Sequence, residues 1–146
     1  MSMELTQMLN KQVANWTVLY VKLHNYHWYI KGHHFFALHE KFEELYNEAN
    51  GYIDELAERI LALEGNPIAT MAECLKMASI KEAAGNENEE AMVRSMKEDF
   101  EMMSGELQEA ISLAEQAGDD GTADMFIGIK QSLAKHIWMF KSFLGT

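Results

Sequence analysis

Cysteine and proline are almost absent from this sequence of 146 residues, which contains one of each. The lone Cys74 excludes an intrachain disulfide, which fits a reducing compartment and therefore a cytoplasmic location. Because Cys74 stands in a Met- and Leu-rich segment, we interpret it as a small buried hydrophobe and not as a nucleophile. Low-complexity segments and internal repeats are also missing, so we expect a single domain over residues 1–146.

Basic residues are scarce as well: 12 Lys and Arg against 23 Asp and Glu give a formal net charge of −11. This balance repels nucleic acid and anionic lipid, and it favours cations or basic partners. The start, MSMELTQMLNK, has no basic arm and no basic tail follows Leu144, so we expect no DNA binding. The sequence shows neither a secretory leader nor an apolar run of about 18 residues, so we expect no membrane association.

What the sequence does contain is helical spacing. Hydrophobic residues make up 48% of the chain, enough for a proper core. They recur at steps of three and four, the spacing of helices with one buried side. Four long helices are predicted, at about residues 5–30, 35–63, 89–117 and 122–144. The polar segment IKEAAGNENEE between the second and third is long enough to be a surface connection.

Residues typical of helix ends separate these segments. Gly65 with Pro67 beyond it predicts a C-cap glycine at the end of the second helix. Thr70, followed three residues later by Glu73, predicts the N-cap and capping box of a short helix. Gly118–Gly121 is expected to end the third long helix. The pattern predicts an all-α, ferritin-like four-helix bundle with a short extra helix in the crossover between the second and third helices.

The helix over residues 35–63 has a second face in addition to its apolar stripe. At roughly 100° per residue, six polar residues fall within an arc of about 100°, well away from the stripe. They are His39, Glu43, Asn47, Asn50, Asp54 and Glu58. His39 with Glu43, and Asp54 with Glu58, are spaced i,i+4, so each pair can direct two side chains at one ion. Imidazole and carboxylate ligands suit iron, manganese or zinc.

The two pairs are too far apart to share an ion. At about 1.5 Å per residue, Glu43 and Asp54 on one straight helix are separated by roughly 16 Å. One chain therefore holds only half-sites. If this face packs antiparallel against the same face of a twofold mate, His39 and Glu43 of one chain come opposite Asp54 and Glu58 of the other. The apolar Phe36 on this face is what a packing surface needs.

Spacing alone leaves other interpretations open. Carboxylates such as Asp54 and Glu58 are usually solvated, and His39 with Glu43 is also a plausible surface pair worth a few tenths of a kcal/mol. His27 continues the core stripe of the first helix, where a hydrogen-bonded core histidine is an equally good explanation. The chain also lacks the Glu-x-x-His motif of ordinary di-iron bundles.

The segment HNYHWYIKGHHFFALHEKFEELYNEANGYIDELAERI resembles the Dps family of mini-ferritins. In that family a His-Trp pair, a Gly-containing turn, a Phe-x-x-Leu-His stretch and an Asp-x-x-Ala-Glu-Arg segment stand at these separations, and the likeness extends to KHIWMF near the C-terminus. The resemblance implies a twelve-subunit cage built from twofold dimers. It also implies a ferroxidase centre to which one subunit gives His27, His39 and Glu43, and its mate gives Asp54 and Glu58.

The sequence departs from the family pattern at two positions. Many relatives have Asp where Glu43 stands, and this longer carboxylate should still reach the metal. The family commonly has proline where His33 stands, and we assign His33 no role. His24 and His136 are interpreted as structural, because nothing in their spacing suggests a ligand.

The resemblance also implies the chemistry. Iron would be oxidised from Fe2+ to Fe3+, with H2O2 preferred over O2, and stored as ferric mineral, which protects against oxidative damage. Trp28, beside His27, is either an electron donor or a packing residue. Glu115, Asp120 and Asp124 stand where the family lines a threefold pore, although acids near a helix N-terminus also complement the helix dipole. The alternatives are a DNA-binding nucleoid protein and a non-catalytic helical scaffold.

Overall fold

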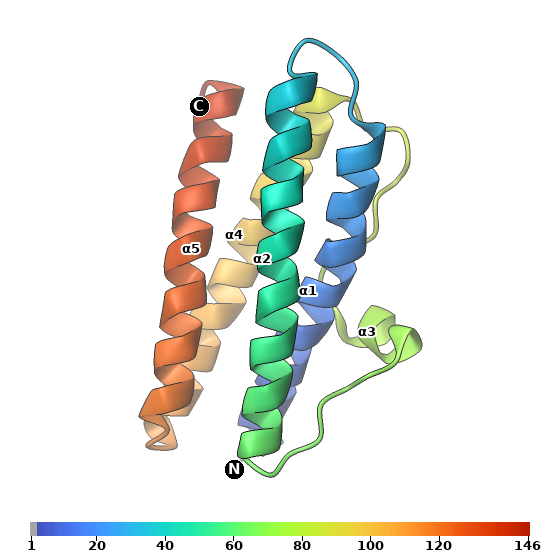
Figure 1. The fold of residues 1–146 in the computed structure, drawn as a ribbon. Helices are drawn as coiled ribbons and strands as arrows, with labels where there is room; N and C mark the ends of the chain where they lie inside the picture. Colours follow the sequence, from blue (N-terminus) through green and yellow to red (C-terminus); the bar gives the residue numbers. More distant parts are fainter. Residues whose placement is uncertain (1–2) are drawn as a thin grey trace.

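The computed structural model describes residues 3–146 as a bundle of long helices (Figure 1). The helices are α1 (Met3–Tyr29), α2 (Phe35–Ala62), α3 (Met71–Met77), α4 (Glu89–Gln116) and α5 (Asp120–Leu144). Within residues 3–146 no strand is present, and no helix is both long and apolar enough to cross a membrane. The predicted four-helix bundle with a short extra helix is confirmed.

The core is built from the predicted apolar stripes. Each long helix contributes at least one large aromatic side chain that is almost fully buried, among them Trp16, Phe42, Phe100 and Phe126. Burying a side chain of this size stabilises the fold by about 1.5–3 kcal/mol. Cys74 on α3 is 4% exposed, which agrees with its interpretation as a buried hydrophobe.

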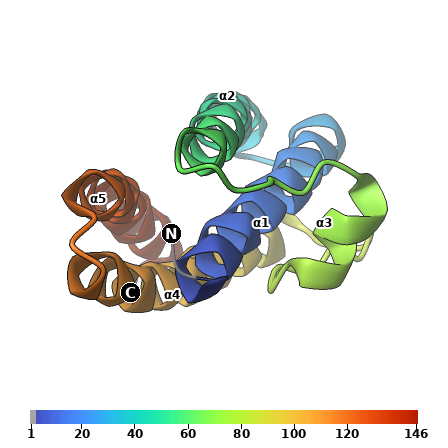
Figure 2. The ribbon, with the colours of Figure 1, turned by 90° about the horizontal axis from the view of Figure 1, so that it is seen from below.

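A long connection carries the chain from the end of α2 to the start of α4 at the opposite end of the bundle (Figure 1). As a result α2 and α4 run parallel, while α1 pairs antiparallel with α2 and α4 pairs antiparallel with α5. Seen along the bundle, α3 lies against α1, on the side away from α5 (Figure 2).

Buried polar side chains of α1 hold this connection in place. Asn10 donates from Nδ2 to the carbonyl of Asn66 (3.1 Å) and accepts at Oδ1 from the amide of Ile68 (2.9 Å). Asn15 accepts at Oδ1 from the amide of Ser79 (2.8 Å). These bonds satisfy backbone groups that the connection would otherwise leave unpaired against the bundle.

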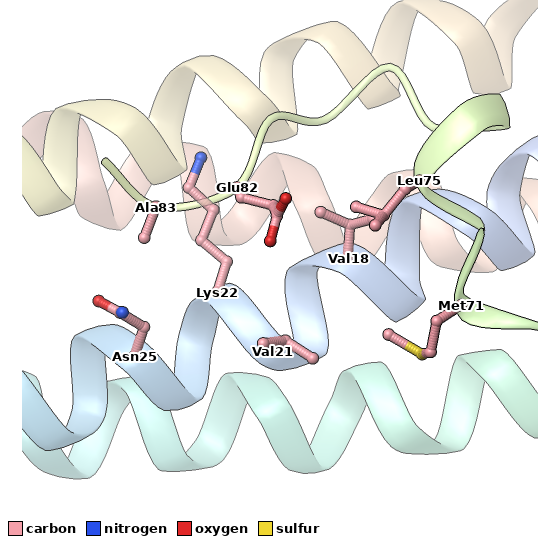
Figure 3. Close-up of a pocket in the computed structure, with 8 residues that line it drawn as sticks. All are labelled: Val18, Val21, Lys22, Asn25, Met71, Leu75, Glu82 and Ala83. Carbon is pink, nitrogen blue, oxygen red and sulfur yellow. The ribbon is translucent and has the colours of Figure 1, made fainter. Parts of the chain in front are cut away.

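A groove remains open between α1, α3 and the end of the connection (Figure 3). Val18, Val21, Met71 and Leu75 form its apolar walls, and Lys22 and Glu82 lie on its other side. The Nζ of Lys22 donates to Asp99 on α4 at 2.7 Å, and both side chains are largely buried. This ion pair ties α1 to α4.

The short helix begins as predicted, whereas the end of α2 differs in detail. Thr70 caps α3 by accepting from the amide of Glu73. At the end of α2, Glu64 and not Gly65 adopts the left-handed conformation, with φ of 66°. Glu64 and Gly65 donate their amides to Leu61 and Ile60, the paired bonds of a Schellman motif. The predicted C-cap glycine is therefore wrong by one residue, because the connection leaves the helix axis earlier.

The start of α5 also differs from the prediction, because the helix includes Gly121. Asp119 is the N-cap and accepts from the amide of Thr122 at 3.0 Å. Arg59 of α2 donates to Asp119 (2.8 Å) and to the Thr122 hydroxyl (2.9 Å). Burial raises the pKa of Asp119, but its bonds to Thr122 and Arg59 outweigh that effect and lower the pKa. The N-cap therefore lies inside the predicted turn Gly118–Gly121, and α5 begins at Asp120, two residues before its predicted start.

Glu87 organises the last part of the connection before α4. Its carboxylate accepts from the amides of Ala84 (2.9 Å) and Gly85 (2.8 Å) and from the Tyr26 hydroxyl (2.9 Å). Burial raises the pKa of Glu87, but these hydrogen bonds more than offset it and hold the pKa at about 2.

This depressed pKa predicts a pH-dependent contribution to stability. Relative to an unfolded pKa of about 4.3, the contribution is complete above about pH 5 and is lost as the pH falls through the folded value. Glu87→Gln should therefore lower Tm clearly at neutral pH, and the difference from wild type should shrink towards about pH 2. Thermal scans by circular dichroism measure this, with the exposed Glu98→Gln as control. A Tm difference that is independent of pH would contradict the assignment.

Candidate metal centre

The end of α1 and the start of α2 bring His27 and His39 together. Their rings stack with centroids 3.7 Å apart and planes inclined by 15°. The Nδ1 of His27 lies 2.7 Å from the carbonyl oxygen of His39, and the Nδ1 of His39 lies 2.7 Å from the carbonyl oxygen of His27. Because a carbonyl only accepts, each Nδ1 carries the proton and each neutral ring keeps a lone pair on Nε2. These mutual bonds hold both rings in the tautomer that binds metal through Nε2.

The turn between the two helices sets this arrangement. Gly32 has φ of 126°, which L side chains rarely adopt, and the Glu89 carboxylate lies where a side chain of residue 32 would point. Glu89 accepts from the backbone amide of His34 (2.7 Å) and from its Nδ1 (3.0 Å). These bonds lower the pKa of Glu89. The first turn of α4 thereby fixes the start of α2 and, with it, His39 opposite His27.

Glu43 lies one turn after His39 on α2 and completes the first group of candidate ligands. Its Oε1 is 3.7 Å from the Nε2 of His27, and its side chain is 53% exposed. His27 itself is 7% exposed, so it belongs both to the core stripe and to the candidate site. His27 can therefore be both a core histidine and a candidate metal ligand, the two interpretations that the sequence left open.

Asp54 and Glu58 form a second, separate group, and both are exposed. A hydrogen bond that the protonated Glu58 donates to Asp54, and the charge of the Asp54 carboxylate, raise the pKa of Glu58. The neighbouring charge disfavours the ionised form of Glu58, and a bound cation would offset that repulsion.

The predicted ligands do not converge within one chain. Among residues 3–146, no three side chains of His, Cys, Asp or Glu are placed to hold a metal ion together. His27, His39 and Glu43 gather near the α1–α2 turn, while Asp54 and Glu58 lie further along α2. Together the two groups offer neutral imidazole and carboxylate, a donor set that suits iron.

Aromatic rings adjoin the histidine pair, and sequence reasoning missed one of them. Tyr46 on α2 stands edge-on to His27, with centroids 5.3 Å apart, and stacks on His24 at 3.8 Å. Partial burial and the charge of Glu43 raise the pKa of Tyr46, so its phenol stays protonated at neutral pH. Trp28 is 68% exposed, and its ring lies 5.2 Å from that of His24. The spacing of Tyr46, three residues after Glu43, could have placed it beside the site.

His136 has structural contacts, as interpreted. It is 5% exposed and donates from Nε2 to Glu48 (2.7 Å), while its Nδ1 lies 3.2 Å from the Nζ of Lys41. Burial raises the pKa of Glu48, but the bonds from His136 and Ser132 outweigh this and lower it. The cluster ties α2 to α5 on the side of α2 that faces its own bundle.

The acids predicted at a pore lie around the turn between α4 and α5. Glu115 is in the last turn of α4, Asp120 begins α5, and Asp124 follows one turn later. All three are exposed. This turn lies at the end of the bundle opposite the α1–α2 turn (Figure 1). The acids are therefore at a distance from the histidine pair and form no part of it.

Comparisons with known proteins give matches that extend over nearly the whole chain and agree with one another. The model of the ferritin-like domain matches residues 6–146. General stress protein 20U of Bacillus subtilis is 61% identical over 99% of this chain and 100% of its own length. DNA protection during starvation protein 2 of Bacillus anthracis is 52% identical over 99% of both chains. The crystal structure of Dps from Staphylococcus aureus has a TM-score of 0.97 and 57% identity, and the match covers 98% of this chain and 96% of that one.

The mutual bonds of His27 and His39 predict their tautomers. In their neutral form, both metal-free rings should carry the proton at Nδ1. Nitrogen-15 NMR of histidine-labelled protein measures this, with His→Gln variants for assignment. His136 is an internal control, because its donation to Glu48 predicts the opposite tautomer, protonated at Nε2. Protonation of His27 and His39 at Nε2 would contradict the geometry.

Proposed function

The chain belongs to the Dps family of ferritin-like proteins, and from this premise we propose that it oxidises Fe2+ at sites shared between two subunits. The ferric product would be stored as mineral inside a cage of twelve chains. The observation that carries the proposal is the pair His27 and His39, each with a free Nε2, beside the exposed carboxylate of Glu43. Their carboxylate partners, Asp54 and Glu58, would come from the mate.

The residues on the outer face of α2 favour one register for this dimer. Consider a twofold axis that crosses α2 midway between Glu48 and Ala49. It places each residue of one α2 opposite the residue of the mate's α2 that lies equally far from the axis in the other direction along the sequence. Across two chains it pairs His39 with Glu58, Glu43 with Asp54, Asn47 with Asn50, and Phe36 with Leu61. Phe36 and Leu61 are 84% and 58% exposed in the single chain. Their contact at both ends of the face would remove apolar surface from water.

The chemistry proposed for such a site is a two-electron reduction of peroxide. Two Fe2+ ions each give one electron, the O–O bond of H2O2 breaks, and both oxygens leave as water or enter the ferric oxide-hydroxide. No hydroxyl radical is released when both electrons arrive together. The carboxylates favour the ferric product, and a site completed by two chains leaves coordination positions open for the oxidant. O2 would serve as the slower oxidant.

The exposed acids at the α4–α5 turn support a route for Fe2+. We assign Glu115, Asp120 and Asp124 to a threefold pore, where rings of carboxylates would attract ferrous ions and lead them inward. Asp120 also complements the dipole at the start of α5, so it has a structural function as well.

The relatives named for DNA protection during starvation suggest a protective function here too. We attribute protection in this chain to the removal of iron and peroxide. DNA binding through phosphate contacts needs Lys and Arg, and the net charge of −11 opposes it.

Sharing of the site between chains predicts complementation between two defective variants. His39→Ala and Asp54→Ala should each abolish rapid Fe2+ oxidation by H2O2, which stopped-flow absorbance measures. In a mixed dimer, one site carries both defects and the other carries none. Random pairing makes about half of the dimers mixed, so co-assembly should restore about a quarter of the wild-type fast phase.

The double variant Glu40→Ala with Glu55→Ala is the matched control, because both residues are exposed on α2 next to a ligand position. It should keep the fast phase. If each site lay within one chain, the mixture would show no recovery. A protein that binds no Fe2+ in anaerobic titration would favour the helical scaffold instead.

The charge balance predicts no stable complex with plasmid DNA. A gel-shift assay at physiological ionic strength should show no retardation at protein concentrations that saturate ferrous binding. The assay repeated at low salt is the control for weak electrostatic attraction. Retardation that disappears as salt increases would support the nucleoid-protein alternative.

A further inference from the structure

Tyr46 lies at the centre of a cluster of aromatic rings that begins at a candidate iron ligand. Its ring is edge-on to His27 at 5.3 Å, stacks on His24 at 3.8 Å and lies 6.1 Å from Tyr20. His24 in turn contacts Tyr20 at 4.6 Å and Trp28 at 5.2 Å. The cluster therefore leads from the ligand His27 through oxidisable side chains to the exposed Trp28.

The position of His24 is held within α1. Its Nδ1 lies 2.7 Å from the carbonyl oxygen of Tyr20, which accepts the hydrogen bond, so the ring is kept flat against Tyr46. The near-parallel planes, inclined by 18°, give the two rings broad contact. A tyrosine that served only to fill the core would not need an imidazole on one side and a metal ligand at its edge.

We propose that Tyr46 donates an electron when only one Fe2+ occupies the site. The inference rests on the proposed function, because that function supplies both Fe2+ and H2O2. One Fe2+ gives a single electron, whereas complete reduction of H2O2 needs two. Tyr46 gives the second electron together with its phenolic proton, so that Fe2+, H2O2 and tyrosine yield Fe3+, hydroxide, water and a tyrosyl radical. The O–O bond breaks without releasing a free hydroxyl radical.

The neighbouring rings then allow the oxidising equivalent to move from Tyr46 towards the protein surface. Tyr20 is an alternative phenol whose ring contacts both His24 and Tyr46, and Trp28 carries the path to the exposed face of α1. Trp28 thus acts after Tyr46 and not as the first donor, since its ring contacts His24 and no ring contact joins it to His27 among residues 3–146. The cluster protects the ligands His27 and His39 from one-electron damage.

The test uses the assembled protein loaded anaerobically with one Fe2+ per site, mixed with H2O2 and frozen for electron paramagnetic resonance. Wild type should give a tyrosyl radical, identified by the narrower signal of protein with ring-deuterated tyrosine. Tyr46→Phe should reduce that signal to background and increase the hydroxyl radical caught by a spin trap. The variant keeps the aromatic ring and its packing and removes only the hydroxyl group.

Tyr52→Phe is the matched control, because Tyr52 is a partly buried tyrosine of α2 that packs against Trp16 in the bundle core. It should keep the radical. With two Fe2+ per site, wild type and Tyr46→Phe should oxidise iron equally fast. A tyrosyl radical that persists in Tyr46→Phe, or iron oxidation in wild type without a radical, would overturn this inference alone. Absence of iron oxidation in wild type would overturn the proposed function itself.

Discussion

The pair of hydrogen bonds between His27 and His39 is the constraint on which the candidate centre depends. Each ring donates to the backbone of the other helix, so the same two bonds align α1 with α2 and select the tautomer of both rings. Loss of either ring would remove one of these two bonds and the stacking contact with the other imidazole. Gly32 and Glu89 support this arrangement from outside, because they fix the turn between the helices.

A second constraint is the straightness of α2. A helix with candidate ligands at both ends of one face cannot fold back to bring them together, so in the proposed centre each end depends on another molecule. In the proposed dimer, folding places the half-sites and association completes them. A chain that has not associated would therefore hold iron weakly, which avoids redox chemistry on an exposed, incomplete site.

The sequence was sufficient to predict the bundle and the separation of the two groups of candidate ligands, since both follow from helical periodicity and rise. Phe42 and Leu56 are buried where the stripe predicts, and Asp54 and Glu58 are exposed on the second face. Contacts between residues distant in the sequence could not be predicted in this way. The left-handed Glu64 depends on where the connection is anchored. The bonds of His27 and the stacking of Tyr46 depend on the register between two helices, which no single periodicity encodes.

The proposed register explains why uncharged asparagines lie at the middle of the outer face of α2. Residues beside a twofold axis meet copies of themselves or of near neighbours, so a charged side chain there would face its own sign. An amide both donates and accepts, and can bond to an identical group without any change in protonation. Asn47 and Asn50 would therefore form a neutral, self-complementary centre between two strongly anionic regions. Such a centre lets two equally acidic surfaces meet before any metal arrives.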